Sequence, residues 1–467
     1  MDNSHFAIAI LAAGKGTRLK SKRAKVLHTI CGKPLLQHVV DAVLQVALPE
    51  QVYVVVGHQA EQVERALAAT GVHFIRQAEQ LGTGHAVQSL REAVGGSSDL
   101  LVLSGDVPLI RPETIERLRN FHATQKAAMT ILTARPENPF GYGRVVRVSP
   151  TGADVAAIVE QKSLSPEQLN LGEINSGIYA FRTDALHRHI DSLRANNAHG
   201  EYYLTDMAAI LRGAGERVVA LETDDATEVL GANTIAEMMQ LDTAMRLATA
   251  HRLMAQGVTI FRPETCVIDG SVSVGADTII EPFVQLLGQT HIGADCHIRS
   301  YSVIQNSTLT DGVLVRNSCV IDHSTIEQGA SIGPFAHLRP QSHIGREAHV
   351  GNFVETKKTR LGERSKANHL AYLGDAEIGT DCNIGAGVIT CNYDGVDKHP
   401  TQIGDGVFVG SNATLVAPVT LEDGSYVAAA SCITEPVPSG ALALGRARQT
   451  TKPGWVAKRK AAGQKRK

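Results

Sequence analysis

Aromatic residues and long apolar runs are scarce in this sequence. Phe, Trp and Tyr together make up 4% of its 467 residues. The longest apolar runs, such as residues 6–13, are far shorter than the roughly 18 residues that a membrane-spanning helix needs. The opening residues, MDNSH, contain no basic segment ahead of a hydrophobic one, so no secretory signal is visible. We therefore expect a cytoplasmic protein without a membrane span.

Excess charge of one sign and paired cysteines are also absent. The 45 Lys and Arg residues nearly balance the 47 Asp and Glu residues, which leaves a net charge of −2. A protein that coats nucleic acid is strongly basic, so we expect no nucleic-acid partner. The seven Cys residues form no CxxC pair, which argues against a disulfide framework and against zinc-ligand spacing. The composition, 43% hydrophobic and 20% charged, is typical of a globular chain.

The second half of the sequence contains a six-residue repeat. Aliphatic residues recur at this interval from Ile268 to Ile433, a period that matches neither an α-helix nor a simple alternating strand. Gly often follows the aliphatic residue, as in Ile292-Gly293 and Val409-Gly410, and we expect these glycines at corners with unusual backbone angles. The pattern is the hexapeptide signature of a parallel β-helix. The repeat positions are Ile268, Val274, Ile280, Leu286, Ile292, Ile298, Ile304, Leu309, Val315, Ile321, Ile326, Ile332, Leu338, Ile344, Val350, Ile378, Ile384, Ile403, Val409, Leu415, Leu421, Val427 and Ile433.

The first 230 residues alternate between short apolar segments and helix-like segments. Strands are predicted at 6–11, 51–56, 100–103 and 129–133, and helices at 37–46, 60–69 and 113–124. This order predicts a parallel sheet covered by helices. The predicted domains are an α/β domain over 1–231, a linker helix over 232–257, a β-helix over 258–436 and a basic tail over 437–467. We expect the last ten residues of that tail to be solvated and disordered.

A glycine-rich loop follows the first predicted strand. Gly14 and Gly16 would let backbone N–H groups approach phosphates, and Lys15 and Arg18 add positive charge. The loop has neither Walker A nor dinucleotide-fingerprint spacing, and an ordinary tight turn is the alternative. Asp106 follows another predicted strand, at the sheet edge where α/β proteins bind ligands. A carboxylate there could hold Mg²⁺, although it could instead cap the next turn.

These motifs together resemble the sugar-nucleotidyltransferase family. The resemblance rests on Leu11-x-x-Gly14-x-Gly16-Thr17-Arg18, Lys25, 77–83 (QAEQLGT), Gly105-Asp106 and 201–206 (EYYLTD). With the repeat behind them, they resemble the bifunctional bacterial enzymes that make UDP-N-acetylglucosamine. The resemblance implies a Rossmann-like domain, a left-handed β-helix and a homotrimer. It also implies two reactions: acetyl transfer from acetyl-CoA to glucosamine-1-phosphate, and uridylyl transfer from UTP to N-acetylglucosamine-1-phosphate with release of pyrophosphate.

For the uridylyl reaction, the resemblance implies a magnesium site and two groups of substrate contacts. Asp106 and Asn233 would bind Mg²⁺, and Lys25 and Arg18 would face the triphosphate. On the residues alone, Glu160 could be a solvent-facing strand residue, Asn175 a turn residue and Asn233 a helix N-cap. The other implied nucleotide contacts are Leu11, Ala12, Ala13, Gly14, Gln77, Gly82, Thr83, Ser104 and Gly105, and the implied sugar contacts are Gly143, Glu160 and Asn175.

The acetyl-transfer site is expected where the six-residue repeat is interrupted, since loops leave a solenoid at such places. The two interruptions are 350–378 and 384–403, and His369 lies in the first. A His has a suitable pKa for a base at neutral pH, and the resemblance implies this role for His369. It further implies that Arg339, Lys357, Tyr372 and Asn383 bind glucosamine-1-phosphate, and that Ala386, Asn392, Tyr393, Ser411, Ala429 and Arg446 bind acetyl-CoA.

Purely structural interpretations of several of these residues stay open. Ala386 and Ala429 could simply be small corner residues of the β-helix, and Arg339 and Lys357 could be solvated surface charges. Two other functions also stay open. One is a nucleotidyltransferase whose β-helix only regulates it, as in enzymes similar to ADP-glucose pyrophosphorylase. The other is a scaffold that binds nucleotide without turnover.

Overall fold

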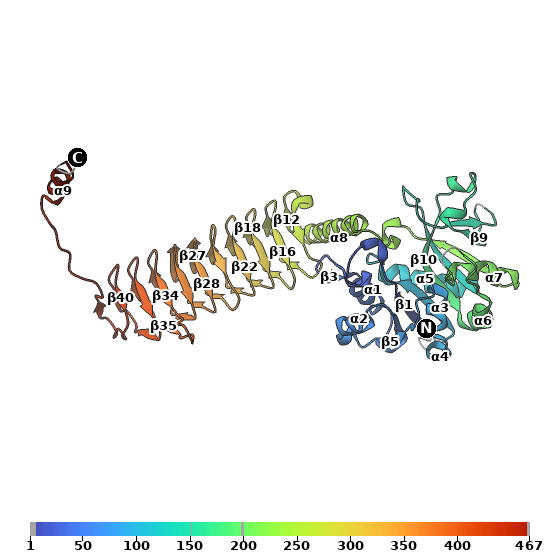
Figure 1. Ribbon diagram of the computed structural model, residues 1–467, viewed down its shortest axis with the longest axis horizontal. Helices are drawn as coiled ribbons and strands as arrows, with labels where there is room; N and C mark the ends of the chain where they lie inside the picture. The colour runs from blue at the N-terminus through green and yellow to red at the C-terminus, as the bar shows by residue number, and fades with distance from the viewer. Residues whose placement is uncertain (1–5, 150, 198–199, 465–467) are drawn as a thin grey trace. The chain divides into compact units, whose positions relative to one another are not determined.

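The structure is a computed structural model that describes residues 6–149, 151–197 and 200–464. The chain divides into two compact units, and the division falls between Met245 and Arg246 inside helix α8 (Ile235–Ala255). Figure 1 shows a sheet with helices in the first unit and stacked coils of short strands in the second. Each unit therefore has the architecture that the sequence predicts, and the fold class is confirmed.

The first unit is built on one mixed sheet with the strand order β11-β7-β10-β6-β1-β4-β5. Strand β10 is antiparallel to β6 and β7, so the prediction of a wholly parallel sheet is wrong there. The chain reaches β10 through the antiparallel pair β8–β9 instead of a crossover helix, and such a connection allows it to return antiparallel. The strands are β1 (Phe6–Ala12), β2 (Thr29–Ile30), β3 (Lys33–Pro34), β4 (Val52–Val56), β5 (His73–Arg76), β6 (Asp99–Ser104), β7 (Met129–Ala134), β8 (Arg144–Arg147), β9 (Val155–Val159), β10 (Ile174–Arg182) and β11 (Val218–Glu222).

Helices cover both faces of this sheet. Ile8 and Ile10 of β1 pack in one apolar core with α1 (Leu35–Val43), α2 (Ala60–Ala66) and α5 (Pro112–Gln125). Ala7 and Ala9 of β1 point into a second core with α3, α4, α6 and α7. This burial of alternate residues on two faces explains why the strands are continuous apolar runs in the sequence. The helices of the second core are α3 (Thr83–Gln88), α4 (Arg91–Val94), α6 (Thr183–His189) and α7 (Met207–Gly213).

The second unit is a β-helix whose coils build three parallel sheets, here called sheets I, II and III. Sheet I contains β12 (Thr259–Ile260), β15 (Ile279–Ile280), β18 (His297–Ile298), β21 (Leu314–Val315), β24 (Ser331–Ile332), β27 (His349–Asn352), β30 (Lys366–His369), β33 (Asn383–Ile384), β36 (Phe408–Val409), β39 (Tyr426–Val427) and β41 (Leu442–Ala443). Sheet II contains β13 (Val267–Ile268), β16 (Gln285–Leu287), β19 (Val303–Gln305), β22 (Val320–Asp322), β25 (His337–Leu338), β28 (Glu355–Lys357), β31 (Tyr372–Gly374), β34 (Ile389–Cys391), β37 (Thr414–Val416) and β40 (Cys432–Ile433). Sheet III contains β14 (Ser273–Val274), β17 (His291–Ile292), β20 (Thr308–Leu309), β23 (Thr325–Ile326), β26 (His343–Ile344), β29 (Arg360–Leu361), β32 (Ala376–Ile378), β35 (Thr401–Ile403) and β38 (Val419–Leu421).

All the aliphatic repeat positions are buried in the interior of this β-helix. The predicted interruption at 350–378 is wrong, because regular coils continue through it with Thr356, Leu361, Ala367 and Leu373 in the interior. Thr356 and Ala367 are not large aliphatic residues, which hides the repeat in the sequence. The second interruption does contain an excursion, a hairpin over 392–400 closed by the Tyr393–Lys398 bridge.

The glycines after the repeat positions have a different cause from the predicted one. Gly293 and Gly410 do not have positive φ angles. A Cβ at Gly293 would lie 2.7 Å from the backbone nitrogen of Asp311, and one at Gly410 would lie 2.4 Å from that of Ala429. Glycine is therefore required because the next coil approaches closely, and no side chain would fit between the coils.

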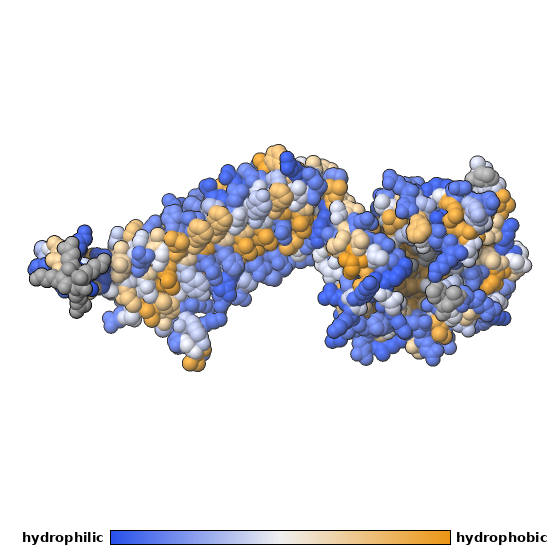
Figure 2. Space-filling view, turned by 45° about the horizontal axis from the view of Figure 1, so that its top comes forward, coloured by the Kyte–Doolittle hydropathy of each residue, from blue (hydrophilic) through white to orange (hydrophobic). Residues whose placement is uncertain are grey.

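Positive φ angles occur at other corners of the coils, some occupied by glycine, such as Gly312 and Gly406, and others by larger residues. In sheet I, bulky residues stand three positions after the buried residue, among them Phe283, Tyr301, Phe335, Phe353 and Leu370, all with φ between 52° and 67°. Two pairs of them stack, with ring centroids 5.1 Å apart for Phe283–Tyr301 and 5.3 Å apart for Phe335–Phe353. Figure 2 shows hydrophobic side chains in a band along the β-helix.

The segments beside the β-helix differ in detail from the predicted boundaries. Helix α8 covers Ile235–Ala255 within the predicted linker 232–257, and β41 (Leu442–Ala443) extends sheet I beyond the predicted end at residue 436. The prediction of disorder is wrong for residues 458–464, which belong to helix α9 (Trp455–Gln464). This helix is rich in the good helix formers Ala, Lys and Arg, and its residues 455–462 are exposed. The last three residues lie outside the described part. No described helix is long and apolar enough to span a bilayer.

Candidate active sites

A cleft of about 520 Å³ opens at the carboxyl edge of the sheet in the first unit. It is lined by the loop after β1, by residues that follow β5 and β6, and by Asn233 just before α8. Ligands bind at this edge in α/β proteins. The predicted residues that line it are Leu11, Ala12, Ala13, Gly14, Arg18, Lys25, Gln77, Gly82, Thr83, Ser104, Asp106 and Asn233.

Two glycines shape the wall of this cleft. Gly16 has φ 62°, and a Cβ there would lie 2.6 Å from Cβ of Lys25, so glycine lets the loop close over the Lys25 side chain. Gly82 has φ 104° and lies against the backbone of Tyr202, whose N–H donates to the Leu81 carbonyl over 2.8 Å. Gln80 and Glu201 also line the cleft, and although they lie within the motifs of the resemblance they are not among the predicted contacts. Lys15, which is predicted to add positive charge to the loop, lines the cleft as well.

Four side chains converge at the base of the cleft. The Lys25 ammonium forms an ion pair with Oδ2 of Asp106 and donates to Oδ1 of Asn233 over 2.9 Å. Arg18 donates to the same Asn233 oxygen over 2.6 Å. The Asp106 carboxylate and the Asn233 amide oxygen thus both face the Lys25 ammonium, and Arg18 adds a second positive charge beside Asn233.

These donors fit a magnesium ion that is also held by substrate. Mg²⁺ prefers oxygen ligands and usually takes one or two from protein, with water and phosphate oxygens completing its octahedron. Asp106 and Asn233 offer two such oxygens directed at one point, as their shared contact with Lys25 shows. Among the described residues, no group of three or more His, Cys, Asp or Glu side chains could enclose a metal by itself.

The three predicted sugar contacts lie together, although they come from three separate segments. The Gly143 carbonyl accepts from the Asn175 N–H over 2.9 Å, and a Cβ at Gly143 would lie 3.7 Å from Oε1 of Glu160. Asn175 is buried and its side-chain amide donates to the Tyr179 hydroxyl over 2.9 Å. Burial raises the pKa of the neighbouring Tyr142 hydroxyl, which stays a neutral hydrogen-bonding group at pH 7. Gly105 lies beneath the cleft, and its N–H donates to the Leu11 carbonyl.

In the β-helix, His369 belongs to a column of corner residues at the end of the sheet I strands. Ala367, Ile384, Val409 and Val427 are paired in register, and two residues further along each coil stand His369, Ala386, Ser411 and Ala429. Each coil is bonded to the next at this corner: the His369 carbonyl accepts from Gly387 over 3.2 Å, and the Ala386 carbonyl from Asn412 over 2.7 Å. Arg446 reaches the end of the column and donates to the Ala429 carbonyl over 2.7 Å.

Positive charge gathers on the outer face of sheet II. Arg339 forms an ion pair with Glu355 over 2.8 Å, and Tyr372 lies in register with Glu355 on the next coil. Lys357 lies close to Lys398 of the hairpin over 392–400, and this second ammonium lowers the pKa of Lys357. Like charges held together in this way favour an anion between them.

Other predicted residues are placed differently. Asn383 begins β33 and lines a separate charged cavity with Arg364 and Lys366, away from the corner of His369. Asn392 is buried and its amide donates to Asp375, whereas Tyr393 is exposed in the hairpin. The interruption argument that pointed to His369 does not hold, but the column provides an independent reason for interest in it.

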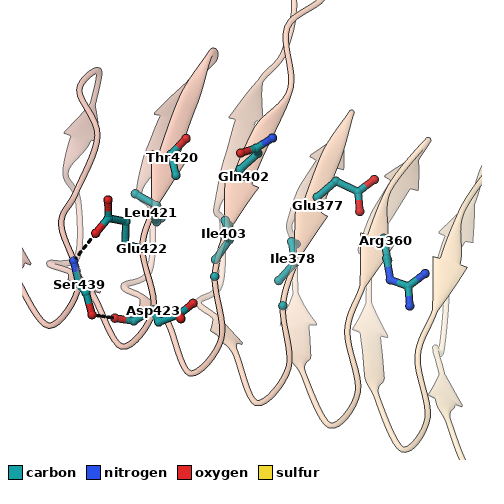
Figure 3. A pocket seen from close by; sticks show the side chains of 12 residues that line it. Arg360, Glu377, Ile378, Gln402, Ile403, Thr420, Leu421, Glu422, Asp423 and Ser439 are labelled. Carbon is teal, nitrogen blue, oxygen red and sulfur yellow. Dashed lines mark hydrogen bonds between the residues drawn. The ribbon is translucent and has the colours of Figure 1, made fainter.

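Another cavity of the β-helix contains none of the residues predicted to bind substrate or acetyl-CoA. It measures about 590 Å³ and lies on sheet III (Figure 3). Neighbouring coils place an outward row of side chains there, formed by Glu377, Gln402 and Thr420. The next residue of each strand is buried, and these residues are Ile378, Ile403 and Leu421. Glu422 and Asp423 are both hydrogen-bonded to Ser439 of the next coil, so they serve the fold.

Comparison with known proteins agrees with both halves. The family model described as MobA-like NTP transferase domain matches residues 8–165, and the bacterial transferase hexapeptide model (six repeats) matches 271–306. The chain is 61% identical to the bifunctional protein GlmU of Koribacter versatilis over 466 residues, which cover 100% of this chain and 99% of that protein. The chain belongs to the GlmU family.

Two further GlmU relatives match over nearly the full length. The identity is 52% with the protein of Solibacter usitatus, over 97% of both chains, and 46% with that of Shouchella clausii, over 98% of this chain and 99% of the other. As a GlmU family member, the chain is a bifunctional enzyme, a uridylyltransferase and an acetyltransferase, and this prediction is confirmed. The alternatives of a regulatory β-helix and a non-catalytic scaffold are thereby set aside.

Proposed function

We propose that the cleft of the first unit joins UTP to N-acetylglucosamine-1-phosphate. The sugar phosphate oxygen attacks the α-phosphorus of UTP in line, the bond to the β-phosphate oxygen breaks, and pyrophosphate leaves. Such a reaction depends on positioning and on charge neutralisation. The convergence of Lys25, Arg18, Asp106 and Asn233 is the observation that carries this assignment.

Each group has a distinct part in this reaction. Lys25 and Arg18 bind the triphosphate, and Asp106 and Asn233 hold Mg²⁺. When bound, the ion neutralises charge that develops on the phosphate oxygens. Gly143, Glu160 and Asn175 hold the sugar, because backbone and side-chain groups of this cluster suit hydroxyl and acetamide partners. Gln77, Gly82 and Thr83 form the wall for the uridine.

For the second unit we propose acetyl transfer at the corner column. His369 takes the proton from the amine of glucosamine-1-phosphate as the nitrogen attacks the thioester carbonyl of acetyl-CoA, and the CoA thiolate leaves. Arg339 and Lys357 bind the sugar phosphate. Ala386 and Ala429, with Ser411 between them, are small residues, which would leave room along the column for the CoA arm.

The position of Asn383 supports a homotrimer. Asn383 is paired with Lys366, which is three residues before His369 in β30, so about 10 Å of strand separates it from the His369 position. Within one chain, therefore, Asn383 and His369 do not meet at the same chemical group of the substrate. A neighbouring subunit in a trimer would supply Asn383 to the substrate at His369.

A product assay tests both activities at once. The enzyme is incubated with acetyl-CoA, glucosamine-1-phosphate, UTP and Mg²⁺, and each component is omitted in turn. We expect UDP-N-acetylglucosamine only in the complete mixture. Without acetyl-CoA, N-acetylglucosamine-1-phosphate should restore the product. Product formation from glucosamine-1-phosphate without acetyl-CoA would contradict the proposed order, and sedimentation of a monomer at assay concentration would contradict the trimer.

A further inference from the structure

The side chain of Asn352 is hydrogen-bonded to the ring of His369. Its Oδ1 lies 2.6 Å from Nδ1 of His369. Among the described residues, no other group is hydrogen-bonded to the His369 ring. The ring is otherwise exposed. Since a neutral imidazole has one N–H and one lone pair, an oxygen acceptor at Nδ1 selects the form with the proton on Nδ1.

The backbone around this pair is adapted to hold it. β27 and β30 each have four residues, whereas the other strands of sheet I have two, and the extension brings Asn352 and His369 into direct register. The strands approach so closely here that a Cβ at Gly351 would lie 2.0 Å from the Asn368 carbonyl oxygen. The Asn352 carbonyl also accepts from the Leu370 N–H over 3.0 Å. Both residues are thus fixed on rigid strands.

We propose that Asn352 is a positioning residue for acetyl transfer, which orients His369 and keeps the lone pair on Nε2 for the substrate amine. The inference rests on the proposed role of His369 as the base. A carboxamide supplies the acceptor without a negative charge, so it selects the tautomer without strengthening the affinity of the ring for a second proton. An imidazole whose Nε2 lone pair is directed at the substrate can accept the proton of the amine.

Several other charged or titratable groups lie on the strands around this pair. His349 precedes Val350 on β27, and its pKa is lowered by burial and then by Arg316, Lys366 and His369. Lys366 lies on β30 itself, Tyr372 on β31, and Glu355 on β28 is paired with Arg339. None of them is hydrogen-bonded to the His369 ring.

Asn317 offers a matched control. It occupies the same corner position two coils earlier, two residues after the buried Val315, and is partly exposed like Asn352. Its carbonyl accepts from Phe335 over 3.1 Å, as the Asn352 carbonyl does from Leu370. The next coil places Pro334 in the column instead of a His. Asn317 therefore shares the structural role of Asn352 without a ring to orient.

The test measures kcat, the KM for acetyl-CoA and the pH dependence of acetyl transfer. We expect Asn352→Ala to lower kcat by about 10-fold to 100-fold, a part of the usual value of acid–base catalysis, with the KM for acetyl-CoA changed less than about twofold. Asn352→Asp keeps the acceptor but adds a charge, so the apparent pKa on the rising limb of the profile should increase by about 1 pH unit, with activity recovered at higher pH. Asn317→Ala and Asn317→Asp should leave kcat and profile unchanged.

Uridylyl transfer and thermal unfolding of each variant show whether it is folded. Equal effects of the Asn352 and Asn317 variants, or an Asn352→Asp profile that matches the wild type, would overturn the inference while leaving His369 as the base. Full acetyl transfer by His369→Ala would instead remove the proposed base, and the positioning role of Asn352 would fall with it. The two failures are thus distinguishable.

Discussion

The two units of this chain assemble their sites in opposite ways. In the first unit, residues from several strand ends and from the start of α8 meet in one cleft, and Lys25 touches Asn233 although 208 positions separate them. In the β-helix, neighbouring coils only add another residue to a straight column, as His369, Ala386, Ser411 and Ala429 do. A sheet with loops gathers side chains at one edge, whereas a solenoid arranges them in rows.

This difference affects how complete each site is within one chain. The cleft of the first unit contains the cationic and oxygen groups that nucleotidyl transfer requires. The column of the β-helix contains the proposed base His369 and the small residues Ala386 and Ala429, whereas Asn383 lines a separate cavity. If the chain assembles as the proposed homotrimer, a neighbouring subunit would supply Asn383 to this column.

The sharpest test of the separation is His369→Ala. We expect acetyl transfer to fall by roughly 10²–10⁴-fold, the usual contribution of a positioned acid–base group, while uridylyl transfer is unchanged. Higher pH should partly restore the variant, because more of the amine is then unprotonated. Each activity is measured with its own substrates, and His323→Ala, at an exposed His directly after β22 of sheet II, serves as the control. Loss of both activities would show that the ring has a structural role.

The complementary variant is Asp106→Asn. We expect uridylyl transfer to decrease by about 10²–10³-fold, as when a charge-stabilising group is removed from an active site, and acetyl transfer to stay normal. Titration of uridylyl activity with Mg²⁺ should also show a higher requirement for the ion. Near-normal activity at low Mg²⁺ would refute the assignment of Asp106.

Gly293→Ala tests the close approach of the coils. The added Cβ would lie 2.7 Å from the Asp311 backbone nitrogen, so we expect the free energy of unfolding of the β-helix to decrease by about 1–3 kcal/mol, the usual cost of overpacking. Denaturant unfolding followed by circular dichroism measures it. Gly96→Ala is the control, because nothing lies within 4 Å of its added Cβ. An unchanged midpoint for Gly293→Ala would show that the coils can separate at no cost.

The smallest effect is expected at the hairpin over 392–400. The backbone N–H of Asp397 and the side chain of His399 lower the pKa of Asp394 to about 2. A carboxylate with a lowered pKa stabilises the folded hairpin above its unfolded value near 4, and this stabilisation is lost as the pH falls towards 2. We expect the Asp394 carboxyl carbon to titrate near pH 2 by NMR, and the hairpin to loosen over the same range. Titration near pH 4 would show that these hydrogen bonds are weak in solution.

Much of the fold follows from local patterns. The strand–helix alternation and the six-residue repeat are visible in the sequence because each buried residue leaves its own periodic mark. The regular coils at 350–378 are not visible in the sequence, since Thr356 and Ala367 fill interior positions without a large aliphatic side chain. The reversal of β10 is not visible either, because no short pattern reports the direction of a strand in its sheet.

The residues of the candidate sites also differ in whether a local sequence pattern reveals them. The loop at 11–18 and Asp106 are recognisable because glycine or a carboxylate directly follows a strand. Glu160, Asn175 and Asn233 look ordinary in their own segments and were identified only through the resemblance. Asn352 carried no signal at all, since a lone Asn at a β-helix corner is common and its partner lies 17 positions away.

The sequence by itself determined the two architectures, the buried rows of the β-helix and the family to which the chain belongs. Only the tertiary structure decided that Asp106 and Asn233 face one cation, that Asn352 is in register with His369, and that Gly293 is required by the next coil. The physical reason is that periodicity and turn preferences depend on neighbours in the chain. Contacts between coils and between strand ends depend on register and packing, which are established only when the whole unit has folded.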